Sequence, residues 1–239
     1  MNLILVEENQ ITTPGHATIR CPETIKHVQN VLNKTSGQTI NVGMKNGNLG
    51  TAKVDLLNDD ELLISNFEFT MTPPKALPMK LIVALQRPKM MRRILRTAAM
   101  IGIKDIHILH SFKVEKSYWM SDFIEKVQWE RSFFEGLSQS RDTIFPRVEL
   151  HTRFKPFVQD CLPQFLEHGP IVVAHPYTEN NLPSKLLGPL TVAIGPEGGW
   201  IDYEINLFES IGAKPMCLSR RILRSEDVLS AIGSRHVDF

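Results

Sequence analysis

The sequence predicts an α/β protein in which a mostly parallel sheet follows a small, strand-rich N-terminal module. Leu81–Leu85 and Leu190–Ile194 are near-continuous apolar runs, the pattern of parallel strands buried on both faces. A loop and a helical pattern follow each of them. The proline-rich stretch from Thr72 to Pro78 marks a change of pattern and is a typical domain boundary. We therefore expect two domains, residues 1–72 and 73–239.

The N-terminal domain combines short strands with one helix. Ile25, Val28 and Leu32 fall at helical spacing and predict a helix over residues 23–35. Asn46-Gly47 is a hairpin signal between two strand-like segments. The predicted strands of this small module are Leu3–Val6, Thr39–Val42, Leu49–Leu57 and Glu61–Phe69.

A helix with a basic stripe is predicted after the first apolar strand of the second domain. It runs from Pro88 to about Ile101, and Gly102 ends it. Residues 80–116 contain nine lysines and arginines against two acidic residues. Such a block in a near-neutral chain suits a phosphate-binding face, and a solvated helix face explains it equally well. The cations at helical spacing are Lys89, Arg92, Arg93 and Arg96.

Two more strands and a long helical stretch follow along the chain. Ile106–Leu109 and Ile171–Ala174 are predicted strands. The second of these ends at His175, a position that fits the rim of a ligand site, although a lone histidine is more often a structural hydrogen-bonding group. Residues 118–140 are predicted to be helical, with a core face made of Met120, Phe123, Val127, Phe134 and Leu137.

A glycine-rich loop, Gly195-Pro196-Glu197-Gly198-Gly199, follows the apolar strand at Leu190–Ile194. Its backbone groups carry little side chain, which suits a ligand held by main-chain hydrogen bonds, such as an adenine edge or a ribose. It matches neither common phosphate-binding glycine motif, and a plain tight turn is the alternative. A helix over Tyr203–Ile211 with Asp202 as N-cap, a strand over Pro215–Leu218 and a helix from about Arg224 complete the chain.

The glycine loop and the segment Leu218–Glu226 together resemble the C-terminal signature of the RsmE family, in the SPOUT superfamily of RNA methyltransferases. The family pattern is Gly-Pro-Glu-Gly-Gly, then Leu-Gly-x-Arg-Ile-Leu-Arg-x-Glu-Thr about twenty residues later. Residues 195–199 match the first motif in full, and Ser219 and Asp227 depart from the second. The N-terminal domain is similar to the family's PUA-like RNA-binding domain, with Asn33 in place of an arginine.

The resemblance implies a C-terminal trefoil knot that holds S-adenosylmethionine (SAM), a homodimer through the knotted domain, and methyl transfer to N3 of a uridine in 16S ribosomal RNA of the small ribosomal subunit. Arg224 and Glu226 are then the catalytic candidates. Expected RNA contacts are the four cations of the basic stripe and Arg141, which ends a segment similar to one in the family. The cofactor-binding candidates are His175, Pro176, Ile194, Gly195, Pro196, Glu197, Gly198, Leu218, Ser219, Ile222 and Leu223.

Composition narrows the alternatives. No apolar run reaches the roughly 18–20 residues of a membrane helix, and no His, Cys, Asp or Glu residues have metal-ligand spacing. Three scattered cysteines and an N-terminus without a secretory pattern lead us to expect a cytoplasmic protein. Two other functions stay open: a methyltransferase for a different RNA or base, and a non-catalytic RNA-binding or ribosome-assembly protein that keeps the fold.

Overall fold

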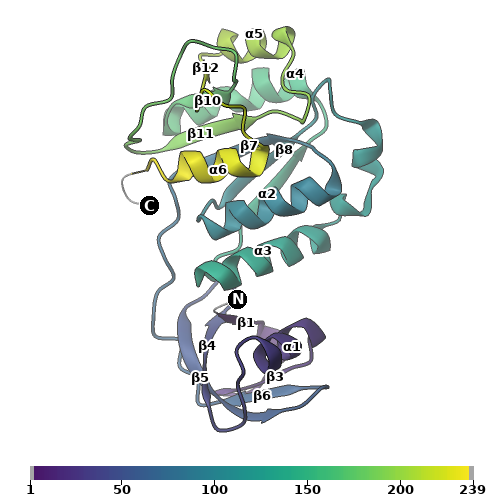
Figure 1. The fold of residues 1–239 in the computed structure, drawn as a ribbon, viewed down its shortest axis with the longest axis vertical. Helices are drawn as coiled ribbons and strands as arrows, with labels where there is room; N and C mark the ends of the chain where they lie inside the picture. Colours follow the sequence, from purple (N-terminus) through teal and green to yellow (C-terminus); the bar gives the residue numbers. More distant parts are fainter. Residues whose placement is uncertain (1–2, 237–239) are drawn as a thin grey trace. The chain divides into compact units, whose positions relative to one another are not determined.

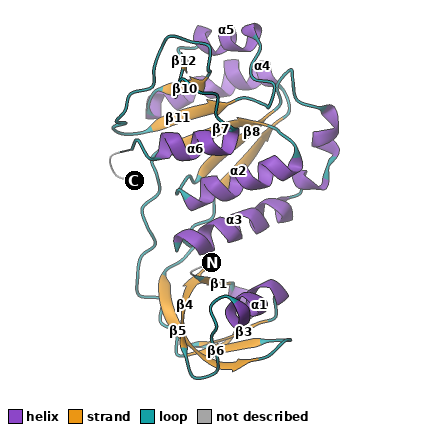
Figure 2. Cartoon of the chain, viewed as in Figure 1, coloured by secondary structure: helices purple, strands orange, loops and turns teal. Residues whose placement is uncertain are grey.

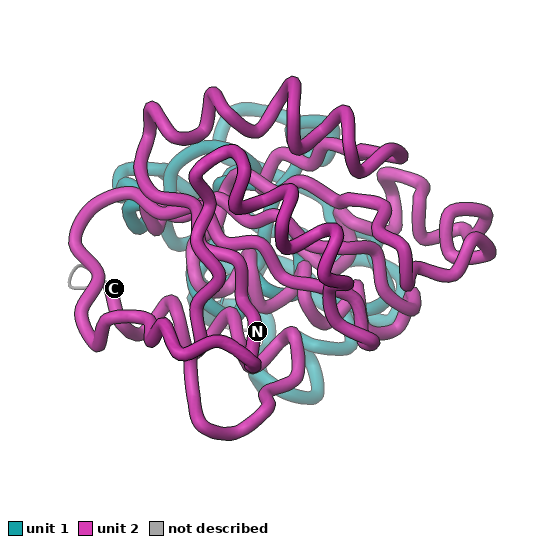
Figure 3. The backbone as a smooth tube through the Cα atoms, turned by 90° about the horizontal axis from the view of Figure 1, so that it is seen from above, with its two compact units in different colours: residues 1–75, 134–145 teal, residues 76–133, 146–239 magenta. Residues whose placement is uncertain are grey.

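The computed structural model describes residues 3–236, so Met1, Asn2 and the last three residues lie outside the description. The chain forms two compact units (Figure 3): unit 1 contains residues 1–75 and 134–145, and unit 2 contains residues 76–133 and 146–239. The first division lies in the proline-rich stretch where the sequence suggested a boundary. Residues 134–145, which we expected in the second domain, group with unit 1, so helix α3 (Lys126–Ser140) begins in unit 2 and ends in unit 1.

Unit 1 is built on a six-stranded sheet in the order β1-β4-β5-β6-β3-β2. Only β1 and β4 pair in parallel; the other neighbours are antiparallel. Residues 134–145 join this unit through backbone hydrogen bonds: Leu3 N–H donates to Ser138 O, and Asn46 N–H donates to Thr143 O. The elements are β1 Ile4–Val6, the 3₁₀ turn η1 Glu8–Gln10, β2 Ile11–Thr13, β3 His16–Ile19, α1 Pro22–Asn30, β4 Thr39–Met44, β5 Leu49–Leu57 and β6 Leu62–Ser65.

The predicted strands of unit 1 are present, but three details differ from the expectation. The helix stops at Asn30, and Asn33 adopts a φ of +50°, a left-handed conformation in which asparagine is more tolerated than arginine. The strand β6 is shorter than predicted. The hairpin of β2 and β3 was missed, because its short, mixed segment on either side of Gly15 has no clear alternation of apolar and polar residues.

Unit 2 contains a six-stranded, wholly parallel sheet in the order β12-β10-β11-β7-β8-β9. Helices α2 and α6 pack together on one face, and α4 and α5 cover the other (Figures 1 and 2). The strands are β7 Met79–Ala84, β8 Asp105–Leu109, β9 Arg147–His151, β10 Ile171–Ala174, β11 Leu190–Ile194 and β12 Lys214–Met216. The helical elements are α2 Pro88–Met100, 3₁₀ turns η2 Lys116–Met120 and η3 Asp122–Ile124, α4 Phe154–Pro156, the π turn η4 Phe157–Cys161, 3₁₀ segment η5 Leu162–His168, α5 Asp202–Ser210 and α6 Ser225–Gly233.

Two predictions for unit 2 are wrong. The stretch 118–140 is not one helix: two 3₁₀ turns precede α3, so helical spacing does not apply at Met120, which is 87% exposed, and Val127 in the first turn of α3 is 63% exposed. Ile201, not Asp202, caps α5. The buried Glu204 carboxylate accepts the Ile201 N–H at 3.0 Å and thus supplies the cap from inside the helix.

Within residues 3–236, no helix combines the length and apolar character needed to cross a membrane.

Candidate functional site

A pocket of about 460 Å³ opens at the carboxyl ends of β7, β10 and β11 in unit 2. Ligand sites of parallel α/β sheets form at this edge, and the volume falls within the usual range for small-molecule pockets. Two loops form most of its wall: the glycine turn, Gly195–Gly199, and the arginine turn, Leu218–Ser225. These loops are 18 residues apart in sequence, and the fold brings them to one cavity as the sequence motifs suggested.

The glycine turn is held by groups from the neighbouring strand ends. Lys113 Nζ donates to the Gly198 carbonyl at 2.7 Å, and the Arg87 backbone N–H donates to Glu197 Oε1 at 3.2 Å. Gly199 has a φ of +69°, which favours glycine, and a β-carbon at Gly195 would lie 3.2 Å from Trp200 Nε1. The glycines therefore let the backbone turn tightly over a buried indole ring.

Arg87 adds a lasting positive charge beside the glycine turn. Its side-chain hydrogen bond to the Tyr118 hydroxyl raises the pKa of Arg87, and the nearby Glu197 carboxylate raises it further. The Arg87 Nε lies 4.0 Å from Glu197 Oε1. Glu197 thus fixes its own loop to the start of α2.

Gln86 joins the two turns. Gln86 is buried, with 1% of its surface exposed. Its Nε2 donates to the Gly195 carbonyl at 3.0 Å and to Ser225 Oγ at 2.7 Å. We did not predict this residue from the sequence. Its position two residues after β7, at the same sheet edge as the glycine turn, was the available signal.

The arginine turn is fastened by the segment between β10 and β11 and by Arg235, which follows α6. Cys217 N–H donates to Asn180 O at 2.7 Å, and Leu182 N–H donates to Cys217 O at 2.9 Å. Arg235 then donates to the carbonyls of Leu182 at 3.0 Å and Leu218 at 2.7 Å. One guanidinium thereby ties the entry of the arginine turn to the β10–β11 connection.

Ser219 causes no backbone strain, although the family pattern has glycine there. It is absent from the residues with positive φ within the described chain, so a side chain is accommodated. Its Oγ accepts the Arg221 N–H at 3.1 Å and so shapes the turn. In the described residues 3–236, the backbone N–H groups of Ile222 and Leu223 donate no hydrogen bond, which leaves main-chain donors at the pocket wall.

The two catalytic candidates occupy different environments. Arg224 lines the pocket with a side chain that is 68% exposed, whereas Glu226 is 12% exposed and lies outside the lining. Arg224 Nε lies 3.0 Å from Asp227 Oδ2, while its Nη1 lies 3.9 Å from Glu226 Oε1. Glu226 instead lies 3.6 Å from Arg93 Nη1 on α2. The nearer partner of Arg224 is therefore Asp227, which we had noted only as a departure from the family pattern.

The structure brings all the cofactor-binding candidates to the pocket, whereas the RNA-binding candidates are divided between α2 of unit 2 and residue 141 of unit 1. Lys89, Arg92 and Arg96 are exposed on α2, and Arg93 is half-buried against Glu226. Arg141 belongs to unit 1 and is exposed. Lining residues that were not among the candidate site residues from the sequence are Gln86, Met90, Ala174, Tyr177, Gly199, Trp200, Arg221, Ser225 and Val228.

Two proteins that are similar to this chain in sequence have the same name. A Treponema pallidum protein named ribosomal RNA small subunit methyltransferase E is 28% identical over 237 residues, covering 97% of this chain and 88% of that protein. A Synechocystis protein of the same name is 29% identical over 157 residues, covering 62% of this chain and 49% of that protein.

Solved structures share the fold over nearly the whole chain. A Legionella pneumophila protein described as a methyltransferase with bound SAM superposes with a TM-score of 0.73 at 20% identity, covering 98% of this chain and 96% of that chain. A Neisseria gonorrhoeae ribosomal RNA small subunit methyltransferase E bound to S-adenosyl methionine gives a TM-score of 0.71 at 18% identity, covering 98% and 95%. At these identities the likeness concerns the fold.

A family model described as an RNA methyltransferase domain matches residues 73–233, which is more than half of the chain and includes both turns of the pocket. The chain therefore belongs to the RNA methyltransferase domain family, as a divergent relative of the RsmE enzymes that its two motifs resemble.

Proposed function

We propose that this protein is a SAM-dependent methyltransferase that modifies N3 of a uridine in 16S ribosomal RNA of the small ribosomal subunit. The observation that carries the proposal is the meeting of the glycine turn and the arginine turn in one pocket. One turn offers a close-approach backbone surface, and the other offers a cation at the rim.

The chemistry of the pocket fits SAM. Its apolar lining, which includes Ile194, Leu218 and Val228, suits the faces of an adenine ring. Backbone N–H groups at Ile222 and Leu223 are available to donate hydrogen bonds to acceptor atoms of the cofactor. We therefore assign cofactor binding to the two turns, with His175 and Pro176 at the rim. When bound, SAM supplies an electrophilic methyl group on a sulfonium centre.

Arg224 is proposed to act on the substrate. Uridine N3 carries a proton at neutral pH, and its removal puts negative charge on the adjacent carbonyl oxygens. A guanidinium at the pocket rim can stabilise that charge as it develops. The Arg224 side chain is exposed, with Nε 3.0 Å from Asp227 Oδ2 and Nη1 3.9 Å from Glu226 Oε1, so the remaining face of the guanidinium can approach a base.

We propose positioning roles for the two carboxylates near Arg224. Glu226 lies between Arg93 and Arg224 and does not line the pocket, so it is better suited to fix α6 against α2 than to accept a proton from the substrate. Asp227 orients Arg224 directly. We therefore propose that Glu226 positions Arg224 and that another group accepts the N3 proton.

The RNA is proposed to contact the exposed cations of α2, namely Lys89, Arg92 and Arg96, with further contacts from Arg93 and from Arg141 of unit 1. These side chains provide salt-dependent affinity for phosphates. Because N3 of a paired uridine is inaccessible, we expect a single-stranded or flipped target base.

We also propose the finer features that the family resemblance implies. The hydrogen bonds of Cys217 and Arg235 to the β10–β11 connection support a trefoil knot in which the C-terminal segment passes through that connection. Unit 1 is proposed to be a PUA-like RNA-binding domain. The exposed apolar side chains Leu187 and Ile222, 83% and 72% exposed, support a homodimer through unit 2. A ribosomal RNA substrate implies a cytoplasmic protein.

Two experiments test the proposal. Calorimetry with SAM should give one site per chain, and no binding at millimolar SAM would leave only a non-catalytic RNA-binding or ribosome-assembly role. Mass mapping of 16S ribosomal RNA from a deletion strain should then reveal one missing methyl group at a uridine. Loss of a methyl group from another base or another RNA would instead establish the alternative substrate, for which the acidic Asp227 beside Arg224 is the observation in favour.

A further inference from the structure

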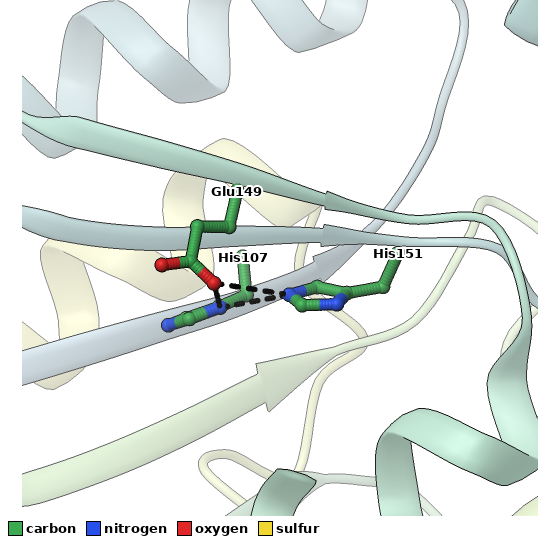
Figure 4. A group of neighbouring side chains, drawn as sticks. All are labelled: His107, Glu149 and His151. Carbon is green, nitrogen blue, oxygen red and sulfur yellow. Dashed lines mark hydrogen bonds and ion pairs between the residues drawn. The ribbon is translucent and has the colours of Figure 1, made fainter.

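Three potential metal ligands converge on the sheet of unit 2, outside the lining of the proposed methyl-transfer pocket (Figure 4). In the parallel pairing of β8 with the edge strand β9, His107 lies opposite Glu149, and His151 follows two residues later. Side chains two residues apart on a strand point to the same face of a sheet. The strand register therefore brings together residues that are more than forty positions apart in sequence.

The ligand atoms form a compact triangle. His107 Nδ1 lies 2.9 Å from His151 Nε2, and Glu149 Oε2 lies 3.7 Å from the first and 3.9 Å from the second. The circle through three points at these separations has a radius of about 2.1 Å, which is the length of a zinc–nitrogen or zinc–oxygen bond. A single ion at its centre would reach all three atoms at bonding distance.

We propose that His107, Glu149 and His151 form a binding site for a divalent transition-metal ion of the zinc type. Two imidazoles and one carboxylate form a known zinc ligand set, and the mixture favours zinc over magnesium or calcium, which prefer oxygen ligands alone. Binding replaces the hydrogen that the two imidazoles share at 2.9 Å, and that proton passes to solvent.

The surroundings of His107 support this assignment. Asp105 Oδ1 lies 3.2 Å from His107 Nε2, and Lys80 Nζ lies 2.9 Å from Asp105 Oδ2. A carboxylate beside the distal ring nitrogen electrostatically favours the tautomer that carries its proton there and presents the other nitrogen to a metal, as in carboxylate–histidine–zinc arrangements. His107 Nδ1 is the nitrogen that faces Glu149 and His151 (Figure 4).

Neighbouring side chains also position Glu149 and His151, and the site is open to solvent on the Glu149 side. Arg147 pairs with Glu149 Oε1, which leaves Oε2 as the atom directed at the histidines. The Phe157 ring packs on His151 with centroids 4.2 Å apart, and Phe165 packs on His107 at 4.9 Å. The His107 side chain is 6% exposed and that of Glu149 is 36% exposed. A water molecule can therefore complete a four-coordinate site from the Glu149 side.

A bound ion would link two neighbouring strands of the sheet. Its ligands join β8 to β9, and among the strands of residues 3–236 β9 pairs with β8 alone. A bound ion therefore stabilises the folded protein by an amount that rises with the logarithm of its concentration above the dissociation constant. The site takes no part in methyl transfer, so its loss leaves SAM binding unchanged.

Zinc titration of the chelator-treated full-length protein, in competition with a chromophoric chelator, tests the proposal. We expect one equivalent of zinc to bind, and at least a hundredfold weaker binding for His151→Gln and for Glu149→Gln. His168→Gln is the matched control, because it removes an exposed histidine outside the cluster. Failure of the unmodified chain to bind one equivalent at micromolar free zinc, or wild-type affinity in both ligand variants, would overturn the proposal.

Cobalt substitution identifies the ligands independently. The three free cysteines are Cys21, Cys161 and Cys217, and binding through any of them would give a sulfur-to-cobalt charge-transfer band. We expect d–d bands of a four-coordinate nitrogen and oxygen site without that band, and its presence would refute the assignment. Calorimetry with SAM on Glu149→Gln distinguishes this result from the proposed function, because the variant should bind SAM normally whether or not zinc is lost.

Discussion

The two turns that wall the pocket are built in different ways. The glycine turn matches the family motif at every position and is fixed through its backbone carbonyls, which accept hydrogen bonds from Gln86 and Lys113. The arginine turn departs from the motif at Ser219 and Asp227 and presents its chemistry through a side chain, Arg224. The glycine turn forms its side of the pocket with backbone atoms and therefore depends on the conformations that glycine allows. The arginine turn acts through the Arg224 side chain, which can be oriented by a different residue, here Asp227.

The largest effect on methyl transfer should come from removing the Arg224 side chain of the arginine turn. Arg224→Ala is expected to lower the rate of methyl transfer by about 10²–10³, the usual result of removing one donor that stabilises developing charge. Its affinity for SAM should stay within a few-fold of the original. Transfer of labelled methyl to small-subunit RNA gives the rate, and calorimetry gives the affinity. Arg220→Ala, in the same turn but outside the lining, is the control; equal rates for both variants would refute the role of Arg224.

Breaking the link between the two turns should have the next largest effect. Gln86→Leu leaves the Gly195 carbonyl without its side-chain donor inside the protein, which is expected to lower the free energy of unfolding by about 1–3 kcal/mol. Affinity for SAM should fall as well, since both walls lose a common support. Urea unfolding measures the first effect. Gln164→Leu, at an exposed position, should change stability far less, and equal losses in the two variants would contradict the bridging role.

The role of glycine in the glycine turn can be tested by glycine-to-alanine substitutions, each of which adds one methyl group. Gly199→Ala forces an alanine to a φ of +69° with no other contact within 4 Å, so we expect a loss of about 1 kcal/mol from backbone strain alone. At Gly198 a β-carbon would lie 2.9 Å from the flexible Lys113 side chain, which can move aside. Gly198→Ala should therefore cost less in urea unfolding. The reverse order would show that the positive φ does not determine the cost.

The smallest expected effect concerns the new partner of Arg224. Asp227→Thr restores the residue type of the family pattern and removes an ion pair whose side chains are 68% and 46% exposed. Exposed pairs contribute little, so the methyl-transfer rate should change by about fivefold or less. The change should shrink further at high salt, which screens the pair. A loss comparable to that of Arg224→Ala would show that Asp227 takes part in the reaction itself.

The sequence predicted the parallel sheet and the turns well, because both follow from local rules. The strand at Leu190–Ile194 is buried along its whole length, as its continuous apolar pattern required, and the glycine turn begins directly after it. The helix of the basic stripe ends within one residue of the expected position, before Gly102. These features depend on burial and on the conformational needs of proline and glycine at fixed positions.

Features that depend on distant partners could not be predicted. Gln86 bridges the turns only because β7 and β11 are neighbours in the sheet, and the histidine cluster exists only because of the register of β8 with β9. Our expectation of no metal site was based on spacing along the chain, and spacing contains no information about strand register. The exposed Met120 shows the same limit, since helical periodicity fails where 3₁₀ turns interrupt the helix.

The position of Arg235 has a consequence for the timing of biogenesis. A nascent chain grows from its N-terminus at about 5–20 residues per second and folds domain by domain. The guanidinium that fastens Leu218 to the β10–β11 connection belongs to Arg235, which follows Leu218 by 17 residues and lies after α6. The arginine turn therefore lacks this fastening until Arg235 has been synthesised, so the cavity between the turns matures later than the strands that carry it.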